Sequence, residues 1–129
     1  MDNTKMLFDG SHEYRILVPT NKEFEERLYR GEVCDDGVIS EGYEQWEFFE
    51  DTYIYLEDRL FDFINVKFGL LINMYEEETL ENEIIPGVIA LTEQLKLEST
   101  EEHFVDLATK FVEMLKLAQQ RNTVVGFFF

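Results

Sequence analysis

The stretch STEEHFVDLATKFVEMLKLAQQRNTVVGFFF (residues 99–129) decides the fold class, because it joins a helix directly to a strand. Steps of three and four residues separate the apolar positions of its first part, which places them on one face of a helix. These positions are Phe104, Leu107, Ala108, Phe111, Leu115 and Ala118. Ser99 or Thr100 can cap this helix and Asn122 can end it. The β-prone residues 123–129 then predict a strand.

A second strand and a second helix are predicted near the start of the sequence. Residues 1–13 read as a loosely held lead-in, and residues 14–18 (YRILV) are typical of a short strand that Pro19 ends. Thr20 or Asn21 can cap a helix that carries apolar residues at helical spacing and ends near Gly31. The glycine-rich residues 31–42 predict a connecting loop.

One long helix is predicted between Tyr43 and Ile64, where rings and leucines follow steps of three and four. Ser40 is its expected N-cap. A competing interpretation makes residues 52–56 a strand, since Tyr-Ile-Tyr favours β-structure. The helix is preferred because its period holds for more than twenty residues.

The region before the last helix is predicted to hold a buried strand and a further helix. Residues 66–75 (VKFGLLINMY) form an apolar run too short to favour a helix. Residues 76–78, all Glu, end this strand and begin a helical stretch, in which Pro86 either introduces a kink or starts a new helix.

These elements predict a single α+β domain over residues 1–129. A small antiparallel or mixed sheet is expected to pack against three to four helices. The alternative is a mainly α domain with a terminal hairpin.

Composition excludes several classes of function. The net charge of −17 repels nucleic acids and anionic membranes, so we expect direct binding to neither. No apolar run approaches the ~18 residues of a membrane span, and residues 1–10 contain only a three-residue apolar run, so no signal peptide is expected. A single cysteine, Cys34, cannot form an intrachain disulfide, which fits a cytoplasmic location. Asp35 and Asp36 beside it disfavour a reactive thiolate.

The residues that carry most enzyme chemistry are scarce. His12 and His103 are the only histidines, and neither belongs to a metal-spaced cluster or a nucleophile motif. Carboxylate pairs are plentiful, but nothing in the sequence singles out one member with a raised pKa. No calcium-binding loop is present. We therefore expect no catalytic residue, no metal site and no cofactor.

The acidic residues are segregated along the chain. Residues 32–58 contain ten of them, and residues 68–95 contain six more, with no Lys or Arg in either block. Solubility alone is met by mixed charge, whereas single-sign blocks predict large acidic surface regions of the kind that steer a cationic partner. A merely solvated surface is the alternative. The residues predicted to bind the partner are Glu44, Glu47, Asp51, Glu76, Glu77 and Glu78.

Aromatic residues lie between the carboxylates of the first block. Phe48 and Tyr55 do not follow the main helical series, so one or both are expected to be partly exposed. Exposed rings among carboxylates suit an Arg- and Lys-rich partner. The alternative is that these rings pack in the core.

Residues 71–80 (LINMYEEETL) resemble small immunity proteins of bacterial polymorphic-toxin and contact-dependent growth inhibition systems. The shared features are an apolar strand that runs into Tyr-Glu-Glu-Glu and an amphipathic helix after it, over about residues 66–97. The resemblance implies a protein that binds a basic toxin domain, often a nuclease, and blocks it stoichiometrically. Two alternatives stay open: a DNA-mimic inhibitor of a host nuclease or other nucleic-acid-binding protein, and a small enzyme with an unrecognised carboxylate pair.

Overall fold

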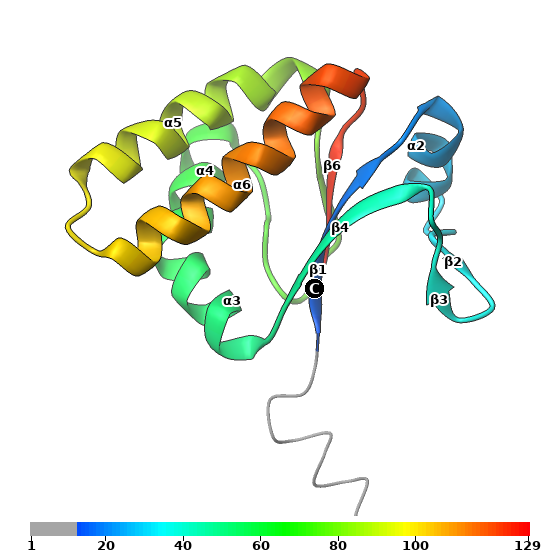
Figure 1. The fold of residues 1–129 in the computed structure, drawn as a ribbon, viewed down its shortest axis with the longest axis horizontal. Coiled ribbons are helices and arrows are strands. Elements are labelled where there is room, and N and C mark those ends of the chain that lie inside the picture. Colours follow the sequence, from blue (N-terminus) through cyan, green and yellow to red (C-terminus); the bar gives the residue numbers. More distant parts are fainter. Residues whose placement is uncertain (1–12) are drawn as a thin grey trace, which may run out of the picture.

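The protein has an α+β fold, in which helices pack on a four-stranded antiparallel sheet (Figure 1). The computed structural model describes residues 13–129, so the predicted lead-in, except Glu13, lies outside the described residues, as does His12. The strands follow the order β4-β1-β6-β5, and each neighbouring pair is antiparallel. Their bounds are Tyr14–Pro19 for β1, Tyr43–Phe48 for β4, Glu78–Leu80 for β5 and Val125–Phe128 for β6. The predicted fold class is confirmed.

The helices lie on both sides of this sheet. Figure 1 shows α3 to α6 on one side, and α2 with a small hairpin of β2 and β3 on the other. The bounds are Lys22–Tyr29 for α2, Cys34–Asp35 for β2, Val38–Ile39 for β3, Glu50–Leu56 for α3, Asp62–Phe68 for α4, Ile85–Glu98 for α5 and Glu102–Arg121 for α6. Within residues 13–129, no helix has the length and apolarity needed to cross a bilayer.

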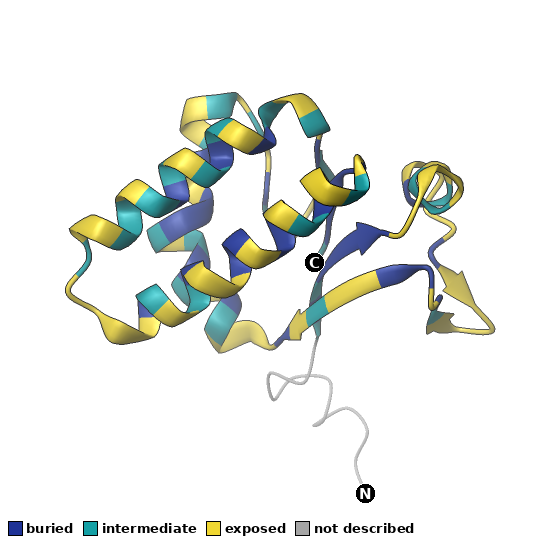
Figure 2. Ribbon diagram, turned by 45° about the horizontal axis from the view of Figure 1, so that its top comes forward, coloured by how far each residue is buried: buried dark blue, intermediate teal, exposed yellow. Residues whose placement is uncertain are grey.

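The main core lies between the sheet and α3 to α6. Tyr14, Ile16 and Val18 of β1 point into this core, as expected from the two-residue period of a strand. Leu17 points to the opposite face of the sheet. Figure 2 shows β1 buried along nearly its whole length, whereas much of β4 is exposed.

A second, smaller core lies beneath α2. Its buried members are Leu17, Leu28, Val33, Tyr43 and Val124. Here the chain passes so close to α2 that only glycine fits at position 42: a Cβ on Gly42 would lie 2.2 Å from Cδ1 of Phe24. This core anchors the start of β4.

Most of the features predicted for the two ends of the described chain are confirmed. The Asn21 side chain caps α2, because its Oδ1 accepts a hydrogen bond of 3.2 Å from the N–H of Phe24. Asn122 ends α6 in the left-handed conformation, with φ of 54°. The strand predicted after it is β6, which lies between β1 and β5. The predicted cap of α6 is wrong, since Glu101 precedes its first residue and no side chain caps it.

The predicted long helix from Tyr43 to Ile64 is wrong over residues 43–49. Residues 43–48 form β4, paired with β1 from Tyr14↔Phe48 to Pro19↔Tyr43. The main-chain ladder with β1 outweighs the apparent helical spacing. Ser40 therefore caps no helix, and its Oγ instead accepts a hydrogen bond from the N–H of Gly42.

Helix does begin at Glu50, so the competing strand over residues 52–56 is also wrong. Between α3 and α4 one π-helical turn, η1 (Glu57–Phe61), inserts an extra residue into the turn. As a result Leu60 and Phe61 are both fully buried, next to each other in sequence.

The predicted strand over residues 66–75 is wrong as well. The helix continues through Phe68, and Gly69 ends it in the left-handed conformation, with φ of 67°. A loop follows, which Asn65 holds by two hydrogen bonds to the main chain of Ile72, of 2.8 and 3.1 Å.

The helical stretch predicted to begin at residues 76–78 begins later, because residues 78–80 form a strand and the α-helix starts at Ile85. Glu78 starts β5, which pairs with β6, and a 3-10 turn, η2 (Asn82–Ile84), leads into α5. Pro86 lies in the first turn of α5, where its missing N–H leaves no hydrogen bond unmade. This was one of the two predicted roles for Pro86.

Candidate functional site

The strand order brings carboxylates from both acidic blocks to one end of the sheet. The last residue of β4, Phe48, pairs with Tyr14 at the start of β1. The first residue of β5, Glu78, pairs with Phe127 of β6, and Phe127 pairs with Ile16, also near the start of β1. The end of β4 and the start of β5 therefore lie at the same end of the sheet. We call this region the acidic end. It consists of Glu47, Glu50, Asp51, Glu76, Glu77 and Glu78.

The carboxylates of the acidic end are exposed, with one exception. Glu47, Asp51, Glu76 and Glu77 of the predicted set are all solvent-exposed. Glu78 is half-buried, and its two carboxylate oxygens accept hydrogen bonds from the N–H groups of Leu71 (3.0 Å) and Thr79 (2.9 Å). Glu78 therefore holds the preceding loop on the sheet.

Few cations balance these charges. Arg15 forms an ion pair with Glu13 and lies with its Nε 3.5 Å from Oε1 of Glu47. No other Lys or Arg pairs with a carboxylate of the acidic end within residues 13–129. The acidic end thus has an uncompensated negative charge.

Glu44 lies away from the other predicted residues. It is opposite Val18, near the start of β4, and its Oε1 is 3.9 Å from Nη2 of Arg121. Strand geometry also directs Glu44 and Glu47 to opposite faces of the sheet, because their positions differ by an odd number. The structure therefore brings together five of the six predicted residues and separates the sixth.

Exposed aromatic rings lie among these carboxylates. Phe49 is 51% exposed and Tyr75 is 86% exposed, and each directly precedes a Glu of the acidic end. Phe48 is buried, with its ring centroid 6.2 Å from that of Tyr14, and Tyr55 is half-buried. The sequence thus indicated exposed rings in this region, but Phe49 and Tyr75 were not among the rings it singled out.

Two tyrosines lie behind the acidic end. The ring of Tyr53 stacks on that of Tyr14, with centroids 4.5 Å apart, and its hydroxyl donates to Oε2 of Glu57 at 2.6 Å. Burial, followed by this hydrogen bond, raises the pKa of Tyr53. Both effects keep the phenol protonated at neutral pH, so Tyr53 is a hydrogen-bond donor rather than a base.

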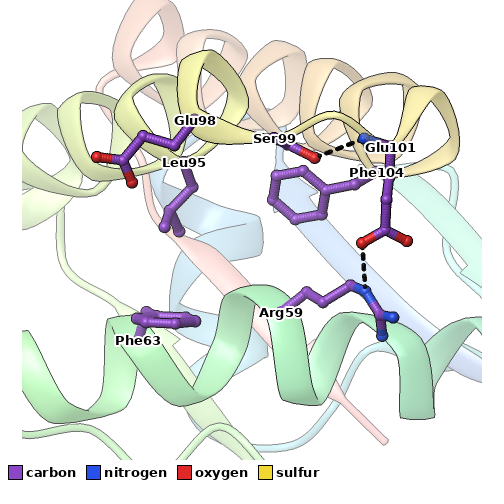
Figure 3. A pocket seen from close by; sticks show the side chains of 7 residues that line it. All are labelled: Arg59, Phe63, Leu95, Glu98, Ser99, Glu101 and Phe104. Carbon is purple, nitrogen blue, oxygen red and sulfur yellow. Dashed lines mark hydrogen bonds and ion pairs between the residues drawn. The ribbon is translucent and has the colours of Figure 1, made fainter.

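A hollow of about 200 Å³ lies between α4 and the α5–α6 junction (Figure 3). Its polar side is held by Glu101, which accepts hydrogen bonds from Arg59 Nε at 3.2 Å and from the Tyr55 hydroxyl at 3.0 Å. The guanidinium of Arg59 also lies over the Tyr55 ring, 4.0 Å from its centroid. The hydrogen bonds from Tyr55 and Arg59 lower the pKa of Glu101, which therefore stays ionised. An acid–base pair needs one carboxyl group with a raised pKa, which Glu101 does not supply.

Metal ligands do not converge within the described residues. Across residues 13–129, no three His, Cys, Asp or Glu side chains are placed to hold one ion. His103 is on the surface, and its ring centroid lies 4.7 Å from that of Tyr55.

Comparisons with protein-family models, curated proteins and solved structures find no match to this chain.

Proposed function

We propose that this protein is a cytoplasmic immunity protein that binds and neutralises a basic toxin domain, through the acidic end of its sheet. The observation that supports this role is the convergence of carboxylates from two separate blocks, Glu47 to Asp51 and Glu76 to Glu78, at one end of the sheet.

The energetics favour a cationic partner. Uncompensated carboxylates repel one another and destabilise the fold, and a basic surface would relieve that repulsion on binding. Such complementarity mainly raises the association rate and the specificity. If the toxin is a nuclease, these carboxylates occupy the positions of substrate phosphates in its groove.

Exposed rings contribute a second component to this surface. Phe49 and Tyr75 can stack on arginine side chains, which is favourable by about 0.5–1 kcal/mol at an exposed site. Aromatic residues are also frequent among the residues that dominate binding energy at interfaces.

The test is binding to the toxin domain encoded beside the gene of this protein, followed by titration calorimetry and an assay of toxin activity. We expect a 1:1 complex with a Kd below about 1 μM. The variant Glu47→Lys/Asp51→Lys/Glu77→Lys should bind and inhibit about 10–100-fold more weakly at 0.01 M salt, while it keeps the circular dichroism spectrum of the native protein.

A matched control separates location from net charge. Glu26→Lys/Glu83→Lys/Glu113→Lys also reverses three exposed carboxylates, and like the first variant it moves the net charge from −17 to −11. It should keep inhibition. If the two variants weaken binding equally, the acidic end is only a solubilising surface. If the native protein binds a host nuclease and not the neighbouring toxin, the DNA-mimic alternative replaces the proposal.

A further inference from the structure

A second surface, distinct from the acidic end, is an apolar groove between α4 and α5. A hollow of about 420 Å³, lined by Phe63, Val66 and Leu91 with Asp62 and Lys67 at its edges, meets the hollow of Figure 3 at Phe63. In Figure 3 the side chains of Phe63, Leu95 and Phe104 surround the space between the helices. We call these two neighbouring hollows, which share Phe63, the α4–α5 groove; its apolar lining is Phe63, Val66, Leu91, Leu95 and Phe104.

Two residues of the apolar lining of the groove are open to solvent. Val66 is 87% exposed and Phe63 is 49% exposed, although both belong to the packed helix α4. Singly exposed apolar residues are common on protein surfaces, whereas these two lie one turn of helix apart and line the same hollow.

The rim of the groove attracts positive charge. Asp62 forms no ion pair within residues 13–129, and burial together with the charges of Glu57 and Asp58 raises its pKa. Arg59 is already engaged by Glu101 and by Tyr55. Among the residues that line the two hollows, the carboxylates (Asp62, Glu98 and Glu101) outnumber the cations (Arg59 and Lys67).

The walls of the groove determine which kind of chain can fill it. Both walls are helices, whose main-chain hydrogen bonds are made internally, so they offer no ladder to an extended peptide. A segment buried here must satisfy its own N–H and C=O groups, which a helix does. Helices also fit such grooves by residues at positions i, i+3, i+4 and i+7.

We propose that the α4–α5 groove binds an amphipathic helix with large apolar side chains on one face and Lys or Arg along its flanks. The inference rests on the proposed function, because it assigns this helix to the basic partner. Binding of this helix adds a hydrophobic contact to the electrostatic contact made by the acidic end. The hydrophobic contact supplies affinity that surface charge alone does not.

The probe is a synthetic helical peptide of about 18 residues, with Leu and Phe on one face and Lys on its flanks. Two controls accompany it: a peptide with the same face but Glu flanks, and one with the same composition in scrambled order. Binding is followed by calorimetry and by ¹H–¹⁵N NMR of the full chain. We expect the Lys-flanked peptide to shift the resonances of Phe63, Val66 and Leu91. Equal binding of the scrambled peptide, or shifts confined to the acidic end, would overturn the proposal.

Variants of two exposed residues locate the contact. Val66→Gln should weaken binding of the Lys-flanked peptide by about fivefold to tenfold, because the peptide would bury this side chain. Leu97→Gln is the matched control, because Leu97 is 82% exposed on α5 but does not line the groove. The affinity of this variant for the Lys-flanked peptide should equal that of the native protein. Asp62→Asn should weaken binding by up to about fivefold, as expected for one surface ion pair. Equal affinity of all three variants and the native protein would contradict the inference.

The same variants distinguish this inference from the proposed function. If the toxin binds the native protein and the Val66→Gln variant equally well, the groove is not part of that interface while the immunity role stands. If the peptide binds in the groove but no toxin domain binds, the groove inference stands and the immunity role fails.

Discussion

Reversal of three charges at the acidic end should act first on the rate of association. In the variant Glu47→Lys/Asp51→Lys/Glu77→Lys, ammonium groups replace carboxylates on both flanks of the sheet. Glu47 lies on β4 at one edge and Glu77 lies beside the start of β5 at the other, so both flanks change together.

The strand order sets the expected magnitude. Two strands separate β4 from β5, so the flanks lie about 14 Å apart at a strand spacing of about 4.8 Å. The screening length is about 30 Å at 0.01 M salt and about 8 Å at 0.15 M. At low salt both flanks therefore attract one cationic patch together, and at 0.15 M each flank acts almost alone. We expect the association rate constant to fall by about 10–100-fold at 0.01 M salt and by less than about tenfold at 0.15 M.

The assay is stopped-flow association with the basic partner over this range of salt. The slope of the logarithm of the rate constant against ionic strength should become shallower in the variant, whereas the dissociation rate constant should change little. The reversal of Glu26, Glu83 and Glu113 is the control, because it changes net charge equally but at scattered sites. If the two variants show the same slope at every salt concentration, the carboxylates do not act as one surface and the reasoning fails.

Three further predictions concern the fold that holds these surfaces. Gly42→Ala should lower the free energy of unfolding by about 1–3 kcal/mol, since its Cβ displaces the Phe24 ring; a urea midpoint equal to the native one would contradict this contact. Asn65→Asp should cost about 1–3 kcal/mol in the same titration, because the donor to the Ile72 carbonyl is lost and a buried acceptor is left unpaired. The pKa of Glu101 is lowered in the folded state, so its contribution is present above the ordinary glutamate pKa of about 4.3 and disappears as the pH falls below it. Glu101→Gln should accordingly flatten the acid limb of a plot of melting temperature against pH, and an unchanged limb would count against the hydrogen-bond network.

Elements that are encoded by local signals were predictable from the sequence. Pro19 ends β1, Asn21 caps α2 and Asn122 ends α6, and each acts through its own main chain or its immediate neighbours. The placement of Pro86 in the first turn of a helix depends on the same kind of short-range chemistry.

Strand β4 was missed because it contributes apolar residues to both faces of the sheet. Tyr43 packs in the small core beneath α2, whereas Trp46 and Phe48 pack on the main core. A strand with apolar residues on opposite faces loses the two-residue alternation, and the three-residue step from Tyr43 to Trp46 then resembles a helix. What decides the structure is pairing with β1, a contact distant in sequence.

The candidate site was predictable in composition but not in arrangement. Two acidic blocks are visible in the sequence, yet which carboxylates meet depends on the order β4-β1-β6-β5. That order leaves Glu44 beside Arg121 and gives Glu78 a role in holding the 70–77 loop. Exposure of Phe49 and Tyr75 follows from the turns that surround them, which the predicted helix and strand boundaries did not contain.

The half-buried ring of Trp46 is an intrinsic fluorescent probe of the edge strand β4. It is the single tryptophan of the 129 residues, it adjoins Glu47, and its ring centroid lies 5.0 Å from that of Phe48. Emission excited at the red edge of the absorption band therefore arises from one position on β4. A partner that covers the acidic end would change the polarity around this indole and shift its spectrum, which allows complex formation to be followed in unlabelled protein.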